Sequence, residues 1–118
     1  MATVIAADTL VALLERWGID HVVGVSREEI EAYYASLVDS DVRHVLARSE
    51  VSAALMVDGY ARTGGGVGVC DGVGGPGAAF IAVGLAEAAG ASSPVVAHRP
   101  TPPRPTIRGA GSHTDDLT

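Results

Sequence analysis

The sequence predicts a three-layer α/β domain, in which a parallel β-sheet carries helices on both faces. Segments with apolar residues at helical spacing alternate with short β-branched runs, in the order α-β-α-β-α-β-α-β. This alternation is typical of right-handed β-α-β crossovers and therefore of a parallel sheet. The 118 residues suit one domain, and the 47% hydrophobic content excludes disorder for the chain as a whole.

The first helix and the first strand have clear ends. Apolar residues at helical spacing predict a helix over residues 6–18, where Gly18 can take the left-handed conformation that ends helices. A short β-branched run bounded by turn residues then predicts a buried strand near residues 20–25.

The next helix begins with a capping pattern. Ser26 and Glu29 have the spacing of a capping box, which predicts a helix over residues 27–37. Apolar and β-branched residues predict a strand near residues 42–47.

The second half of the chain repeats the alternation and ends in a proline-rich tail. A helix is expected from Ser49 to about Arg62, because three consecutive glycines follow it. The remaining predicted elements are a strand near 66–71, a helix over 77–90 and a strand near 94–98. Four prolines after residue 99 exclude a helix or a central strand there.

Charge and cysteine content exclude several functional classes. The net charge is −6 and all eight basic residues are Arg, so a basic nucleic-acid surface is not expected. The only cysteine, Cys70, cannot form an internal disulfide, which favours the cytoplasm. The chain shows no signal-peptide pattern and no apolar run that predicts a membrane span.

Two segments follow predicted strands at the edge where parallel sheets bind ligands. Glu50 follows the second strand and starts a helix. It either stabilises the helix N-terminus or supplies a carboxyl group for a proton-sharing hydrogen bond. The residues Gly74, Gly75, Pro76 and Gly77 follow the third strand. They form either a tight turn with Pro at the helix start or a loop whose backbone approaches a flat or anionic ligand.

The other polar and reactive residues have simpler interpretations. Cys70 lies among small strand residues and is expected to be a core thiol, and Tyr33 and Tyr34 are interpreted as helix packing. The four histidines lack metal-ligand spacing, so no zinc site is expected: His21, His44, His98 and His113.

Three segments resemble, in order, the start of thiamine diphosphate enzymes of the acetolactate synthase type: AADTLVALLERWGIDHVVGV, DSDVRHVLARSEVSAALMVDGYARTGG and GVGVCDGVGGPGAAFIAVGLAEAAGASSPVVA. The tail IRGAGSHTDDLT lies where that family has a stretch similar to Arg-Gly-Ala-Phe-Gln-Glu. The resemblance runs from about residue 6 to 118. It implies a pyrimidine-binding α/β domain over residues 1–99, in a truncated form of the thiamine diphosphate-binding fold, and an extended tail over residues 100–118.

The resemblance also assigns roles to the residues at the ligand-binding edge. Glu50 matches the glutamate that hydrogen-bonds N1′ of the aminopyrimidine of thiamine diphosphate. Gly75, Pro76 and Gly77, preceded by Gly74, match the loop that lies against the pyrimidine ring.

The sequence departs from the family pattern at several polar positions. Ser49 stands where His is common, Ala79 and Phe80 replace Thr and Asn, and Gly111 and Ser112 replace Phe and Gln. These changes remove polar contacts near the expected cofactor and substrate.

The implied activity is decarboxylation or carboligation of a 2-oxo acid substrate. No segment resembles the Gly-Asp-Gly…Asn region that holds magnesium and the diphosphate, so a separate diphosphate-binding domain, partner subunit or homo-oligomer is expected to supply it. The chain would then be incomplete as an enzyme on its own. Two alternatives remain: a degenerate or truncated relative acting as a non-catalytic interaction module, and a small nucleotide-binding domain that uses the Gly-Gly-Pro-Gly turn.

Overall fold

The chain folds as the alternation predicts. The computed structural model describes residues 2–26 and 30–99. Its elements follow one another in this order: α1 (Ala2–Arg16), β1 (His21–Gly24), α2 (Glu31–Val38), β2 (Arg43–Leu46), α3 (Glu50–Tyr60), the π-helical turn η2 (Ala61–Gly65), β3 (Gly68–Asp71), α4 (Pro76–Gly90) and β4 (Val95–His98).

The four strands form one parallel sheet in the order β2-β1-β3-β4. The register pairs Val23 with both Val45 and Cys70, and Cys70 with Ala97. Because all strands run the same way, the segments that follow β2 and β3 leave the sheet at the same edge. Those segments contain Glu50 and the glycine-rich turn.

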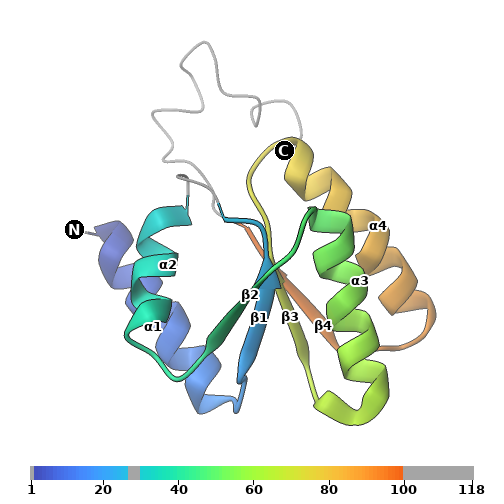
Figure 1. Cartoon of the computed structure of the whole chain (residues 1–118), viewed down its shortest axis with the longest axis horizontal. Coiled ribbons are helices and arrows are strands. Elements are labelled where there is room, and N and C mark those ends of the chain that lie inside the picture. Colours follow the sequence, from blue (N-terminus) through green and yellow to red (C-terminus); the bar gives the residue numbers. More distant parts are fainter. Residues whose placement is uncertain (1, 27–29, 100–118) are drawn as a thin grey trace.

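Helices cover both faces of the sheet, which confirms the three-layer class. Figure 1 shows α1 and α2 on one face and α3 and α4 on the other. Each helix pair buries its own hydrophobic core against the sheet. The core beneath α1 and α2 includes Val11, Leu14, Val22, Tyr33, Leu37 and Val69. The core beneath α3 and α4 includes Val23, Ala53, Ala54, Val57, Cys70 and Ile81.

Several boundaries differ from the predicted ones. Helix α1 begins four residues earlier, at Ala2, and ends at Arg16. Gly18 follows it with φ +73°, and its N–H donates to the Glu15 carbonyl, as in the turn that glycine makes at helix ends. Each predicted strand is shorter than expected, with four residues in the sheet.

The structure does not test the predicted capping box at the start of the second helix. The helix begins at Glu31, and Ile30 occupies the N-cap position without a side-chain hydrogen bond. Glu29 lies outside the described residues, as do Arg27 and Glu28 and the predicted tail over 100–118. In α3, by contrast, Ser49 is the N-cap and accepts a hydrogen bond from the Ser52 N–H at 3.1 Å.

No helix in the described part of the chain has the length and hydrophobicity needed to cross a membrane.

Helices α3 and α4 pack closely at Gly84, and a pair of glycine substitutions tests this contact. A Cβ at Gly84 would lie 2.3 Å from the Ala54 Cβ, whereas a Cβ at Gly59 of α3 would meet nothing within 4 Å. We expect Gly84→Ala to lower the free energy of unfolding by about 1–3 kcal/mol through overpacking. Gly59→Ala should raise it by roughly 0.5–1 kcal/mol, because Ala has the higher helix propensity. Urea unfolding of both variants measures the difference, and equal effects would contradict the close packing.

Candidate functional site

Glu50 lies at the carboxyl edge of the sheet, as the first residue of α3. Its side chain is buried, with 8% of the residue exposed. Among the hydrogen bonds and ion pairs of residues 2–26 and 30–99, none involves its carboxylate. The carboxylate oxygens are not among the fully buried, unsatisfied polar atoms of the described residues, so they face solvent at this edge and have hydrogen-bonding capacity to offer a ligand.

The glycine-rich turn between β3 and α4 lies directly against Glu50. A Cβ at Gly77 would come within 2.9 Å of Glu50 Oε1, and a Cβ at Gly72 within 3.3 Å of Glu50 Cγ. The structure therefore brings the two predicted segments together, and the glycines leave the space that the carboxyl side chain uses.

The turn has a backbone conformation that suits glycine. Gly75 has φ +66° and is the N-cap of α4, and Pro76 follows at the start of the helix. A residue with a side chain is strained at that φ. Gly75 and Gly77 are buried and Pro76 is exposed, so the Pro76 ring is the part of the turn that faces solvent at the sheet edge.

Three of the positions where the sequence departs from the family pattern, Ser49, Ala79 and Phe80, lie around the same edge. The Ser49 hydroxyl caps α3 and also lies 2.9 Å from the Ser52 hydroxyl, so it is already engaged. Phe80 is 50% exposed on α4, and Ala79 beside it is exposed as well. Gly111 and Ser112 lie outside the described residues.

A second group of polar residues, which the sequence analysis missed, lies at the end of β3. Asp71 is fully buried. Its carboxylate accepts a hydrogen bond from the Tyr34 hydroxyl at 2.8 Å and lies 3.1 Å from His44 Nε2. The sequence contained one signal for it: an aspartate that directly follows Val69 and Cys70 in an otherwise apolar strand.

Cys70 is buried in the core under α3 and α4, as the sequence suggested. Burial, with a smaller contribution from the Asp71 charge, raises the pKa of its thiol to about 12. At neutral pH the thiol is therefore protonated and unreactive. Among the described residues, no cluster of three or more His, Cys, Asp or Glu side chains could hold a metal ion.

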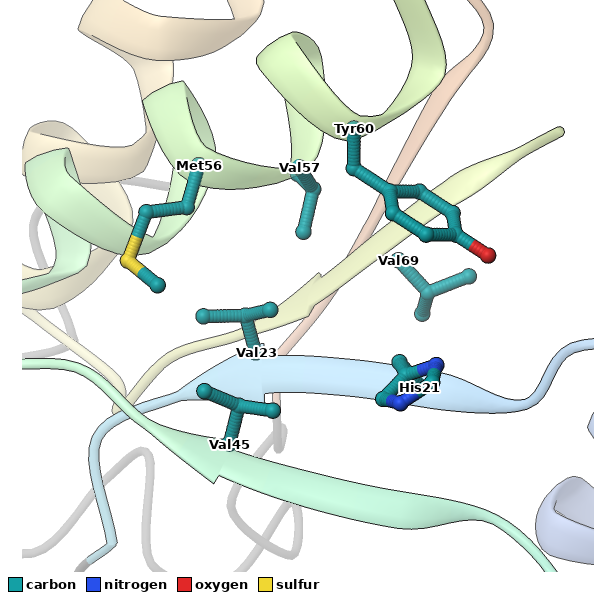
Figure 2. A pocket seen from close by; sticks show the side chains of 7 residues that line it. All are labelled: His21, Val23, Val45, Met56, Val57, Tyr60 and Val69. Carbon is teal, nitrogen blue, oxygen red and sulfur yellow. The ribbon is translucent and has the colours of Figure 1, made fainter. Parts of the chain in front are cut away.

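An open apolar pocket lies elsewhere, between α3 and the β1–β2 side of the sheet. Figure 2 shows it, with a volume of about 210 Å³. Its lining residues are His21, Val23, Val45, Met56, Val57, Tyr60 and Val69. The helical ones come from the last turns of α3, whereas Glu50 starts that helix, so neither Glu50 nor the glycine-rich turn lines this pocket.

Polar residues lie at one end of this pocket. The Tyr60 hydroxyl donates to Asp20 Oδ1 at 2.9 Å, and His21 Nδ1 lies 2.8 Å from the same oxygen. The hydrogen bond with His21, and then that with Tyr60, holds the pKa of Asp20 below its ordinary value.

Comparisons with known proteins identify the fold and the family of this chain. A 4-hydroxybenzoylformate decarboxylase from Rhodococcus jostii, described as thiamine diphosphate-dependent, has the same fold, with a TM-score of 0.78 and 24% identity. The match covers 86% of this chain and 19% of that one.

Relatives by sequence come from several organisms. A probable acetolactate synthase large subunit of Methanocaldococcus jannaschii is 40% identical over 91 residues, which are 77% of this chain and 15% of that protein. The acetolactate synthase isozyme 2 large subunit of Escherichia coli is 42% identical over 91 residues, or 77% of this chain and 17% of that protein. A probable 2-ketoarginine decarboxylase of Pseudomonas aeruginosa is 39% identical over 94 residues, or 80% and 17%.

The chain thus matches less than a fifth of the length of each of these relatives. The family model described as "Thiamine pyrophosphate enzyme, N-terminal TPP binding domain" matches residues 5–115. The chain therefore belongs to the family of thiamine pyrophosphate enzymes, as their N-terminal TPP binding domain.

Proposed function

We propose that this chain is the pyrimidine-binding domain of a thiamine diphosphate-dependent enzyme that decarboxylates or joins 2-oxo acids. One observation carries the proposal: a buried carboxyl group without a partner among the described residues, Glu50, lies against a turn of glycines at the ligand-binding edge of a parallel sheet. The similarity to acetolactate synthases and to a 2-ketoarginine decarboxylase supports the class of reaction.

The residues at this edge fit the aminopyrimidine half of the cofactor. A flat heteroaromatic ring needs a surface without side chains, and Gly75 and Gly77 carry none at this edge. The ring nitrogen needs an acid, and the Glu50 carboxyl group can donate to it. Because Glu50 is buried, few water molecules compete for that hydrogen bond.

The roles of the chain's own residues follow from this arrangement. Glu50 would hold a proton at a carboxyl oxygen and share it with the ring nitrogen, which orients the ring and tunes its basicity. Gly74, Gly75, Pro76 and Gly77 would support the ring and keep side chains away from it. When bound, thiamine diphosphate supplies a nucleophilic carbon and an electron sink for the bond that breaks.

The diphosphate half of the cofactor requires groups from another domain or subunit. Magnesium and a diphosphate are bound through carboxylates and cationic side chains. This chain has a net charge of −6 and no Lys, and its described residues offer no carboxylate cluster for a metal ion. We therefore assign magnesium to a diphosphate-binding partner, which would supply much of the affinity.

The surface of α4 supports association with such a partner. Glu87 is the only charged residue in this helix, and Phe80 and Val83 are 50% and 58% exposed. A helix that is apolar on all sides is normally buried. At the two edges of the sheet, Leu46 and Val96 are also exposed. A partner subunit, or a second copy of the chain, would cover such surfaces.

A second function is favoured by one observation. Ala79 and Phe80, near the start of α4, offer no polar side chains to a cofactor, and the Ser49 hydroxyl is used by the helix cap. These features suit a non-catalytic relative that retains the fold as an interaction module. Cofactor binding separates the two functions, because only the first one requires it.

The decisive measurement is calorimetry with thiamine diphosphate and magnesium. We expect the purified 118-residue chain to bind weakly or not at all. Tight binding should appear when the chain is combined with a diphosphate-binding domain that carries the Gly-Asp-Gly…Asn segment. A tight, magnesium-dependent isotherm from the chain alone would contradict the need for a partner. If no such domain produces binding that Glu50→Gln weakens, the interaction-module function is the correct one.

A further inference from the structure

A buried polar cluster lies behind the glycine-rich turn, on the face of the sheet that α1 and α2 cover. Asp71 is the last residue of β3 and is fully buried. Its side chain lies across the end of β1, where a Cβ at Gly24 would be 1.7 Å from Asp71 Oδ1. The absence of a side chain at Gly24 therefore lets the carboxylate reach across β1.

The carboxylate of Asp71 connects three elements. Its Oδ1 accepts from the Tyr34 hydroxyl of α2 at 2.8 Å, and its Oδ2 lies 3.1 Å from His44 Nε2 of β2. The Tyr34 and His44 rings meet edge to face, with centroids 4.6 Å apart. Burial and the nearby Asp71 raise the pKa of Tyr34, which keeps its hydroxyl protonated as a donor.

Two further titratable side chains border the cluster. His98 is the last residue of β4, and the centroid of its ring lies 5.0 Å from that of the Tyr33 ring of α2. Burial lowers the pKa of His98. The Tyr33 hydroxyl is buried and has no hydrogen-bond partner among the described residues. Tyr33 and Tyr34 are therefore adjacent tyrosines of which only the second bonds to Asp71.

The cluster and the candidate site meet at consecutive residues. The Asp71 side chain points to α2, whereas a Cβ on Gly72 would point to Ile81 of α4 and to Glu50. The Gly72 N–H also donates to the His98 carbonyl at 3.1 Å. The position of the residue that starts the turn is thus set by the contacts of the residue before it.

We propose that Asp71 is a positioning residue: its bonds to Tyr34 and His44 fix the carboxyl end of β3 and so hold residues 72–77 against Glu50. A buried charged group is a poor choice for stability alone, because apolar residues of similar size often do as well. The two hydrogen bonds instead fix the direction in which the chain leaves β3. Its significance for cofactor binding rests on the proposed function, but the positioning itself does not.

Cys70 reports directly on this part of the sheet. It is the only cysteine of the chain, is fully buried, and precedes Asp71. A thiol reagent such as 5,5′-dithiobis(2-nitrobenzoic acid) can reach it only when the end of β3 opens or when α3 and α4 separate from the sheet. The labelling rate without denaturant therefore measures opening in this part of the fold, and hydrogen exchange locates it.

The experiment compares the same substitution at three tyrosines. We expect Tyr34→Phe to speed Cys70 labelling about tenfold to hundredfold, the range expected when a hydrogen bond to a charged group is lost. Tyr33→Phe removes a hydroxyl without a partner among the described residues, and Tyr60→Phe removes a 2.9 Å bond to Asp20 outside the cluster. Both controls should change the rate less than about twofold, because neither hydroxyl holds Asp71.

Histidine variants and hydrogen exchange separate local positioning from general destabilisation. His44→Gln keeps a donor and should label close to wild type, whereas His44→Leu should label as fast as Tyr34→Phe. In Tyr34→Phe, amide exchange should accelerate at residues 72–78 and stay unchanged in α1. Equal acceleration in both regions, or labelling of Tyr34→Phe at the wild-type rate, would overturn the proposal.

These measurements are made without cofactor. If Glu50 does not serve thiamine diphosphate, the labelling and exchange results still stand. If the complex binds the cofactor but Tyr34→Phe leaves residues 72–78 unchanged, only the positioning role is wrong.

Discussion

Glu50→Gln is expected to lower the rate of C2–H exchange of bound thiamine diphosphate by roughly 10²–10⁴-fold, the usual contribution of a positioned acid or base. The amide has the shape of the carboxyl group but cannot share a proton with the ring nitrogen. The measurement is deuterium exchange followed by NMR, on the chain assembled with its diphosphate-binding partner. Exchange at the wild-type rate in this variant would remove Glu50 from the proposed function.

The same variant should not harm the fold. The Glu50 carboxylate has no hydrogen-bond or ion-pair partner in the described part of the chain, so the amide breaks no such contact and loses only the favourable charge at the start of α3. We expect thermal unfolding of Glu50→Gln close to the wild-type temperature. Glu87→Gln is the matched control, because Glu87 is exposed and pairs with Arg62 at 3.0 Å. That control should leave the C2–H exchange rate unchanged.

Gly24→Ala is expected to destabilise the fold strongly. The new Cβ would overlap Asp71 Oδ1 at 1.7 Å, and Asp71 cannot move without losing Tyr34 and His44. An uncompensated buried charge costs about 3–5 kcal/mol. Domains of this kind have roughly 5–15 kcal/mol of stability, so the variant should unfold at markedly lower urea concentration.

A double variant identifies the cause. Asp71→Ala removes the side chain that the new methyl group would strike and leaves only its 2.8 Å approach to the Asp71 carbonyl oxygen. Gly24→Ala with Asp71→Ala should therefore lose less stability than the sum of the two single variants. Such coupling is expected of residues in direct contact. Additive losses in the double variant would show that the clash is not the origin of the effect.

The sequence predicted the sheet because its signals are local. Helical spacing and β-branched runs appear within single segments, and parallel order follows from their alternation. The ends of the elements were harder to predict, because they depend on which backbone groups find a hydrogen-bond partner in the folded chain. The first helix was predicted over residues 6–18, whereas α1 spans Ala2–Arg16. The first strand was predicted near 20–25, whereas β1 spans His21–Gly24.

The candidate site was predictable only in part. Parallel topology alone places Glu50 and the turn of residues 74–77 at one edge, but their contact depends on the packing of α3 against α4. The Asp71 cluster was not predictable in this way, because Tyr34 lies 37 residues and His44 27 residues from Asp71. The spacing of residues in the sequence does not predict that these three side chains come into contact. Their contact arises from strand register and from the missing side chain of Gly24.

The strand order also has a consequence for how the chain is made. As synthesis proceeds, β2 can join β1, β3 can join the other side of β1, and β4 can then join β3. Each strand after β1 pairs with a strand that has already emerged from the ribosome. No strand has to be inserted later between two strands that are already paired. Since domains fold during translation from the N-terminus, this sheet can grow outward from its oldest strand, with only one new edge exposed at each addition.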